Sequence, residues 1–215
     1  MPPELKIKVC GMTQLQQVHQ LIAMQVDYAG FIFYDKSPRY VVGKMLPEDF
    51  NNIPIDIKKV GVFVNETVKN ILSIVHTYGL NYVQLHGDET SDFCKELAAE
   101  VPIIKAFRVS DKEDILKITK PYMDSAAYFL FDTKAAAYGG TGKKFNWKVF
   151  ENVQIGKPWF LSGGIGPEDS FLVNEFIKNG NAKELLALDL NSKFETEPGA
   201  KDMNLLSDFV RQYKF

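Results

Sequence analysis

The segment Lys6-Ile7-Lys8-Val9-Cys10-Gly11 begins the pattern that decides the fold. Its side chains alternate between polar and apolar, as they do in a β-strand whose two faces meet different surroundings. The next segment carries apolar residues at helical spacing, at Leu15, Val18 and Leu21. Together the two segments predict a strand followed by a helix that crosses over to a parallel neighbour.

This unit of strand and helix recurs along the whole chain. Seven further short apolar segments follow at a steady interval, at 28–33, 60–64, 82–85, 103–107, 127–131, 159–162 and 185–189. Over 215 residues, eight units average about 27 residues each, which suits a closed (β/α)8 barrel, the α/β fold known as the TIM barrel. An open, doubly wound parallel sheet is the alternative for the same order of elements.

The composition is that of an ordinary globular chain. Apolar residues make up 46% and charged residues 24%, and 25 basic residues against 27 acidic ones give a formal charge of -2. This composition excludes disordered, collagen-like and disulfide-scaffold proteins, and the charge gives no general attraction to nucleic acid. No linker or low-complexity tract divides the chain, so we expect a single barrel domain over residues 1–215.

Cysteine content and hydropathy indicate the compartment. Cys10 and Cys94 are the only cysteines in a chain large enough to fold without disulfides, which favours a reducing environment. No apolar run approaches the roughly 20 residues that cross a bilayer. We therefore expect a cytoplasmic protein with no membrane or nucleic-acid partner, either a monomer or a homodimer.

Cys10 is the first candidate catalytic residue. It ends the first predicted strand on the polar face, and in a parallel barrel the carboxyl ends of the strands form the active face. Lys8, two residues back on this face, would favour the thiolate, so that Cys10 could act as a base or nucleophile. A buried cysteine with a purely structural role is the alternative, and it is the role we expect for Cys94.

Asp132 is the second candidate. It follows the apolar segment Tyr128-Phe129-Leu130-Phe131, and desolvation at an apolar rim would disfavour its charged form. A protonated carboxyl could then donate a proton near neutral pH, whereas a helix cap or a loop ion pair is the alternative. A thiol and a carboxyl on different strands suggest proton transfer rather than acyl transfer.

Glycine-rich segments after the late strands suit a phosphate group. They are Gly139-Gly140-Thr141-Gly142 and Gly163-Gly164-Ile165-Gly166, and Asn191-Ser192 follows the eighth predicted strand, which ends at Asp189. Glycines let backbone N–H groups converge on phosphate oxygens, and barrels commonly bind phosphate between the loops after strands seven and eight. We expect a phosphorylated small molecule as the ligand, with plain turns as the alternative for either run alone.

Two further residues follow other strands. Arg39, in Ser37-Pro38-Arg39-Tyr40, could hold a carboxylate by a bidentate fork, with a surface salt bridge as the alternative. His86 follows the fourth predicted strand. With three histidines in the chain and no cysteine or carboxylate at ligand spacing, we expect no metal site and an orienting or core role for His86.

Motifs over almost the whole chain, in order, resemble those of the phosphoribosylanthranilate isomerase family. They are Lys6-Ile7-Lys8-Val9-Cys10-Gly11, Ser37-Pro38-Arg39-Tyr40-Val41, Val60-Gly61-Val62-Phe63-Val64-Asn65, Gln84-Leu85-His86-Gly87-Asp88-Glu89, Phe131-Asp132-Thr133, Gly139-Gly140-Thr141-Gly142 with Phe145 and Trp147, Leu161-Ser162-Gly163-Gly164-Ile165, and Pro198-Gly199-Ala200-Lys201-Asp202. Several independent motifs in one order make a chance likeness improbable.

The resemblance implies a (β/α)8 barrel that uses neither a metal nor an organic cofactor. It implies an Amadori rearrangement of N-(5-phosphoribosyl)anthranilate to 1-(2-carboxyphenylamino)-1-deoxyribulose 5-phosphate in tryptophan biosynthesis. In the family, the thiol at the position of Cys10 removes the C2 proton of the sugar and the acid at the position of Asp132 protonates the ring oxygen. The arginine matching Arg39 holds the anthranilate carboxylate.

The segment after the eighth predicted strand departs from the family pattern Asp-Val-Ser-Ser-Gly-Val-Glu. It reads Asp189-Leu190-Asn191-Ser192-Lys193-Phe194-Glu195, so that Ser192 and Glu195 match while Lys193 replaces the glycine. Lys193 changes what the local backbone can adopt and adds a positive charge toward the phosphate. Gly163 and Gly164 are therefore favoured over Asn191 as phosphate contacts.

Two other functions fit the same residues. One is a different sugar-phosphate barrel enzyme, such as a carbon–carbon lyase or an indole-forming synthase, although Cys10 rather than a lysine argues against a Schiff base there. The other is a non-catalytic phosphate-binding barrel. Phosphate binding alone would not require an acid and a base on opposite sides of the barrel mouth.

Overall fold

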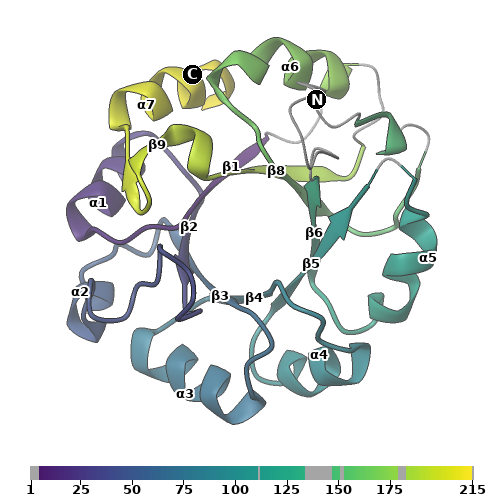
Figure 1. Ribbon diagram of the computed structural model, residues 1–215, viewed down its shortest axis with the longest axis horizontal. Helices are drawn as coiled ribbons and strands as arrows, with labels where there is room; N and C mark the ends of the chain where they lie inside the picture. Colours follow the sequence, from purple (N-terminus) through teal and green to yellow (C-terminus); the bar gives the residue numbers. More distant parts are fainter. Residues whose placement is uncertain (1–4, 111, 134–146, 151–152, 179–182, 215) are drawn as a thin grey trace.

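Parallel strands close into a barrel in chain order, with helices around the outside (Figure 1). The computed structural model describes residues 5–110, 112–133, 147–150, 153–178 and 183–214. The barrel strands are β1 (Lys6–Cys10), β2 (Tyr28–Ile32), β3 (Lys58–Phe63), β4 (Tyr82–Leu85), β5 (Ile103–Val109), β6 (Tyr128–Thr133), β7 (Trp159–Ser162) and β8 (Leu185–Leu190). Because β1 pairs with both β2 and β8, the closed barrel is confirmed over the open sheet.

The helices return the chain from one strand to the next. They are α1 (Leu15–Ala23), α2 (Pro47–Asn51), α3 (Val68–Tyr78), α4 (Ser91–Ala98), α5 (Ile115–Thr119), α6 (Ser170–Lys178) and α7 (Met203–Lys214), with the 3-10 turns η1 (Lys120–Tyr122), η2 (Trp147–Phe150), η3 (Pro167–Asp169) and η4 (Ser192–Phe194). Thr67 and Thr90 cap α3 and α4 by accepting a hydrogen bond from the third backbone N–H of each helix. Among the described helices, none has the length and apolar character needed to cross a membrane.

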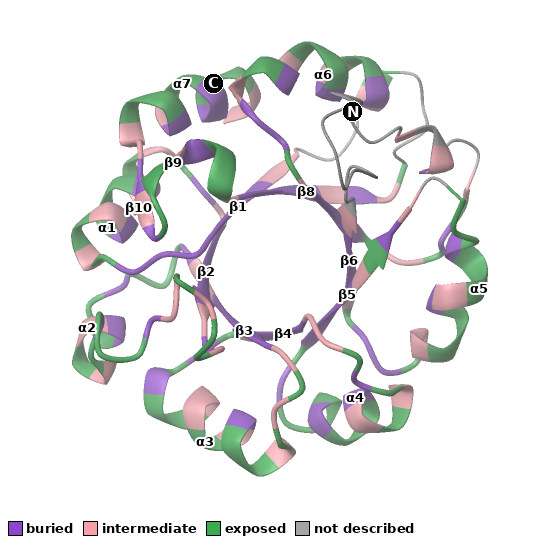
Figure 2. Ribbon diagram, in the orientation of Figure 1, coloured by how far each residue is buried: buried purple, intermediate pink, exposed green. Residues whose placement is uncertain are grey.

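Apolar side chains fill both faces of the barrel wall. The larger cluster lies between strands and helices, and Figure 2 shows buried strands inside a ring of helices with exposed outer faces. The barrel interior holds a second cluster: Tyr28, Val60, Ile104, Ala106, Leu130, Phe160 and Ala187. The interior is therefore packed, as expected of this fold, and a ligand can enter only at one end.

Side chains alternate along β1 as predicted. Lys8 and Cys10 are buried, and the ammonium group of Lys6 lies 5.8 Å from the ring centre of Tyr28, a residue of the interior cluster. The polar set of β1 therefore faces inward. The same alternation directs Gln84 and Asp132 to the inner side, where both line the cavity described below.

A buried ion pair joins the first and last strands of the barrel. Lys8 lies opposite Asp189 in the β1–β8 register, and its Nζ is 2.7 Å from Asp189 Oδ1. Ser162 Oγ donates to Asp189 Oδ2 at 3.0 Å. Burial by itself lowers the pKa of Lys8, but Asp189 and Cys10 more than offset this effect, and the pKa is raised. Lys8 is therefore a charged ammonium group.

We expect Lys8→Met to lower the free energy of unfolding by about 3–5 kcal/mol, because it leaves a buried carboxylate without its cation. Urea denaturation measures the loss. Adding Asp189→Leu should recover most of it, since the double variant replaces the pair with apolar groups. A double variant no more stable than Lys8→Met would contradict the assignment.

The segment after β8 forms an antiparallel hairpin that the sequence pattern did not predict. The hairpin strands are β9 (Glu195–Glu197) and β10 (Ala200–Lys201). Before it, Lys193 lies within η4, and the only described residues other than glycine with positive φ are Gln25 and Asn65. The loop therefore accommodates Lys193 without a left-handed backbone.

Candidate active site

One cavity, of about 220 Å³, gathers most of the predicted site residues at the carboxyl ends of the strands. The predicted residues that line it are Cys10, His86, Asp132, Gly163, Gly164, Asp189, Asn191 and Ser192. Gly140 and Gly142 lie outside the described residues. Residues from five different strands or the loops after them thus reach one small space.

Cys10 lies at the end of β1 with its sulfur close to β2. A Cβ added at Gly30 would lie 2.8 Å from Cys10 Sγ, so only glycine at this position leaves room for the thiol. Burial raises the pKa of the Cys10 thiol, and Lys8 opposes this effect. Lys8 thus acts in the predicted direction, and desolvation outweighs its effect on the pKa of Cys10.

Asp132 ends a hydrogen-bonded chain that begins on β4. Gln84 Nε2 lies 2.9 Å from His86 Nδ1, and His86 Nε2 lies 3.3 Å from Asp132 Oδ2. When Gln84 donates to Nδ1, the ring proton is on Nε2, which donates to the carboxylate. The side chains of His86 and Asp132 are each 22% exposed, so the carboxyl group faces both the cavity and its partner.

The loops after β7 and β8 form the glycine-rich side of the cavity. Gly163 and Gly164 have φ values of +100° and +69°, in the left-handed region that favours glycine. η4 begins at Ser192, and the first N–H groups of a helix have no partner inside it. Lys193 also lines the cavity. This side therefore combines backbone N–H groups with one positive charge.

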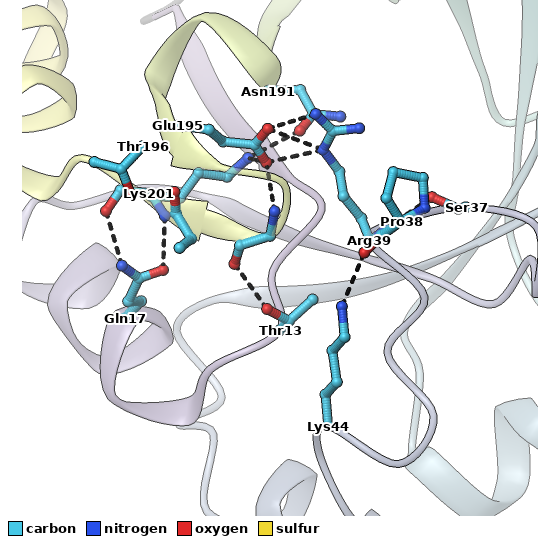
Figure 3. A network of polar contacts seen from close by, with 12 residues as sticks. Thr13, Gln17, Ser37, Pro38, Arg39, Lys44, Asn191, Glu195, Thr196 and Lys201 are labelled. Carbon is cyan, nitrogen blue, oxygen red and sulfur yellow. Dashed lines mark hydrogen bonds and ion pairs between the residues drawn. The ribbon is translucent and has the colours of Figure 1, made fainter.

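Arg39 is bound to Glu195, and Figure 3 shows the pair beside Asn191. Asn191 lines the cavity, whereas Arg39, although predicted as a site residue, is not among the lining residues. Its Nε donates to both carboxylate oxygens of Glu195, at 2.9 and 3.0 Å, and its Nη2 donates to Oε2. These hydrogen bonds raise the pKa of Arg39. A Cβ added at Gly11, next to Cys10 in the sequence, would lie 2.7 Å from Arg39 Cδ, so the arginine stem packs against the backbone that follows Cys10.

Comparison with known proteins agrees with this geometry. Residues 7–212 match the family model described as N-(5'phosphoribosyl)anthranilate (PRA) isomerase. The chain belongs to this family. Its reaction is an intramolecular aldose–ketose isomerisation in tryptophan biosynthesis.

Individual members of the isomerase family match the chain over nearly its full length. The N-(5'-phosphoribosyl)anthranilate isomerase of Parabacteroides distasonis is 40% identical over 210 residues, covering 96% of this chain and 92% of its own. The crystal structure of the Thermotoga maritima enzyme is 33% identical, with 98% of each chain covered and a TM-score of 0.80. A crystal structure of a phosphoribosyl anthranilate isomerase in complex with reduced 1-(o-carboxyphenylamino)-1-deoxyribulose 5-phosphate is 30% identical, with 98% of each chain covered and a TM-score of 0.78.

Three residues of this isomerase site were not among the predicted site residues. Glu195 and Lys201 lay only in quoted motifs, and Gln84 was expected only to face the interior. No local pattern reveals that Glu195 binds both Arg39 and Lys201, because the contact between Arg39 and Glu195 spans 156 positions. Their presence in motifs shared with the isomerases was the available signal.

The raised pKa of Cys10 predicts how its reactivity depends on pH. We expect alkylation by iodoacetamide to be slow at pH 7 and to accelerate up to and beyond pH 9, because only the thiolate reacts. Mass spectrometry of the Cys10 peptide at timed intervals measures the rate. A plateau already reached at pH 7 would contradict the raised pKa.

Proposed function

We propose that Cys10 and Asp132 catalyse the isomerisation of N-(5-phosphoribosyl)anthranilate to 1-(2-carboxyphenylamino)-1-deoxyribulose 5-phosphate. The observation that carries this proposal is the shared cavity, which takes a thiol from β1 and a carboxyl from β6. The solved relative bound to the reduced product supports a substrate with a phosphate at one end and a carboxylate at the other. The substrate is a phosphorylated small molecule.

Asp132 acts first, as the general acid. It gives its proton to the ring oxygen of the ribose while the bond between this oxygen and C1 breaks. The lone pair of the anthranilate nitrogen forms the new double bond to C1, which yields an iminium ion. His86 keeps the carboxyl oriented through its Nε2. Proton transfer of this kind typically contributes about 10²- to 10⁴-fold to a rate.

Cys10 acts second, as the general base. The iminium ion acidifies the hydrogen on C2, and Cys10 removes it to give an enolamine. Because burial raises the pKa of the thiol, the thiolate that acts here is the minor form at neutral pH, and Lys8 stabilises it. A proton then moves to C1 while the C2 hydroxyl loses its own, which leaves a ketone at C2. The atoms of the product are those of the substrate, and no electron leaves or enters, so the reaction as proposed needs no redox cofactor.

The two charged ends of the substrate are assigned to two groups of residues, the loops that line the cavity and Arg39 outside its lining. Gly163, Gly164 and Ser192 are proposed to bind the phosphate, with Lys193 beside them, and Arg39 is proposed to bind the anthranilate carboxylate. Gly140, Gly142, Asn191 and Asp189 belong to the proposed substrate-binding set as well. Fixing both ends orients the reacting ring between the acid and the base.

The setting of the enzyme is also part of the proposal. We propose that the chain works as a single barrel domain in the cytoplasm, either as a monomer or as a homodimer. The two cysteines, both unpaired, support a reducing compartment.

The direct test is turnover by the purified protein in a buffer with a chelator and no added cofactor. We expect the fluorescence of phosphoribosylanthranilate to disappear and a product of the same mass to form. Binding without turnover would favour the phosphate-binding protein. Release of indole or cleavage of a carbon–carbon bond would favour the other barrel enzymes.

A further inference from the structure

Two charged side chains, Arg39 and Lys201, bind the carboxylate of Glu195, and Lys201 also binds Asn191, which lines the cavity. Glu195 accepts hydrogen bonds from Arg39, from Lys201 Nζ at 2.7 Å and from the backbone N–H of Gly199 at 3.2 Å. Figure 3 shows Arg39 and Lys201 on opposite sides of this carboxylate. The Lys201 side chain is fully buried and that of Glu195 is 4% exposed, whereas that of Arg39 is 19% exposed. Arg39 is therefore the member of the cluster that faces outward.

The cluster carries one excess positive charge. Arg39 and Glu195 alone would form a neutral pair, with the guanidinium already satisfied by a carboxylate at two nitrogen atoms. Lys201 adds a second cation to the same carboxylate. A half-buried site attracts an anion more strongly when it carries an unbalanced positive charge, because charges interact more strongly there than in bulk water.

We propose that Lys201 is the positioning residue that makes the Arg39 subsite able to bind the substrate carboxylate. Lys201 balances the negative charge of Glu195 from the side opposite Arg39. The positive charge of the guanidinium then remains available to the substrate carboxylate. This inference rests on the proposed function, in which Arg39 binds the carboxylate of the anthranilate ring. Lys201 itself acts through Glu195 and Arg39.

The hairpin that carries Lys201 is fastened to the segment that follows Cys10. Gln17 of α1 makes two hydrogen bonds to the backbone of Lys201: Nε2 donates to the carbonyl oxygen at 2.8 Å, and Oε1 accepts from N–H at 2.9 Å. Thr13 Oγ1 donates to the carbonyl oxygen of Gly199 at 2.7 Å. A Cβ at Gly199 would lie 2.8 Å from Thr13 Oγ1, and the φ of +91° likewise requires glycine.

The Lys201 ammonium group has two fixed acceptors inside this frame. It donates to Asn191 Oδ1 at 2.8 Å as well as to Glu195. Burial lowers the pKa of Lys201, and Glu195 opposes this effect. The lysine is thus tied to the loop after β8 and to β9 while its backbone is tied to α1. These contacts fix the ammonium group of Lys201 next to the carboxylate of Glu195.

The test must also account for Cys10, because the charges of Lys201 and Arg39 act on its thiol. The charged groups that act on Cys10 are Lys8 from β1, Asp189 from β8, Lys201 from β10 and Arg39 from the loop after β2. Removing Lys201 therefore disfavours the Cys10 thiolate and slows every substrate. Comparison of two substrates that differ only in the carboxylate cancels this common effect.

The experiment measures kcat/KM for phosphoribosylanthranilate and for the matching glycosylamine of aniline, which lacks the carboxylate. In Lys201→Met we expect the preference for the carboxylated substrate to fall at least about tenfold, which corresponds to about 1.4 kcal/mol. The control is Lys44→Met, which removes a positive charge from the same region. Lys44 is exposed and donates to the carbonyl oxygen of Pro38 at 2.8 Å, so its loss should leave the preference unchanged.

A second variant covers the case in which Lys201→Met does not fold, as judged by thermal denaturation. Gln17→Leu removes both hydrogen bonds to the Lys201 backbone, and we expect it to lower the preference about threefold. An unchanged preference in the folded Lys201→Met or in Gln17→Leu, or an equal fall in Lys44→Met, would overturn the role of Lys201. Absence of turnover by the wild type would instead reject the proposed function itself.

Discussion

Cys10→Ala should lower kcat by about 10²- to 10⁴-fold while the KM for phosphoribosylanthranilate stays within about threefold. The side chain that is lost is the proposed base for the C2 proton, whereas the phosphate and carboxylate contacts come from other loops. Loss of substrate fluorescence over time measures kcat, and titration of the inactive variant with substrate measures binding.

Cys94→Ala is the matched control for the thiol. Cys94 is buried in α4 and does not line the cavity, and burial raises its pKa to about 11. This variant removes the same group from the helical layer, so we expect kcat to stay within about twofold of the wild type. Equal activity of Cys10→Ala and Cys94→Ala would reject Cys10 as the base.

Asp132→Asn should have the second large effect, with kcat again reduced by about 10²- to 10⁴-fold. The amide keeps the size of the carboxyl group and can still contact His86, but it cannot give a proton to the ring oxygen. Ring opening then becomes the slow step. A rapid-mixing experiment should therefore find no early intermediate with an opened ring.

Asp88→Asn is the control for the carboxyl. Asp88 is exposed at the same end of the barrel, two residues beyond His86, and it does not line the catalytic cavity. We expect its activity to remain within about twofold of the wild type. If Asp132→Asn retained a comparable rate, a different acid would have to open the ring.

The barrel was predictable because its signal is local and repeated. Each strand shows a short apolar segment with residues such as Leu130 and Phe131, and each crossover shows helical spacing, so the order of elements could be read directly. The inward direction of Cys10 and Asp132 followed from the alternation of side chains between the two faces of a strand. These predictions are confirmed by the closed sheet and by the cavity that both residues line.

The contacts between distant loops were not predictable in the same way. The sequence predicts Arg39 as a candidate to bind a carboxylate, but its bond to Glu195 depends on how the hairpin β9–β10 folds back toward α1. Likewise, the direction in which the pKa of Cys10 shifts depends on how deeply the thiol is buried. The spacing of residues in the sequence does not show this depth. Sequence shows which residue types reach the mouth of the barrel, whereas only the structure shows which charges are already paired.

The Lys8–Asp189 pair also bears on how the protein is made. A ribosome releases β1 long before β8, and until then the ammonium group of Lys8 has no counterion at the place where it must be buried. A barrel that lacks β8 would therefore bury Lys8 without its counterion, which disfavours closure before the last strand is made. Since Lys8 and Asp189 both act on Cys10, the thiol has its final electrostatic surroundings only once the last strand is in place.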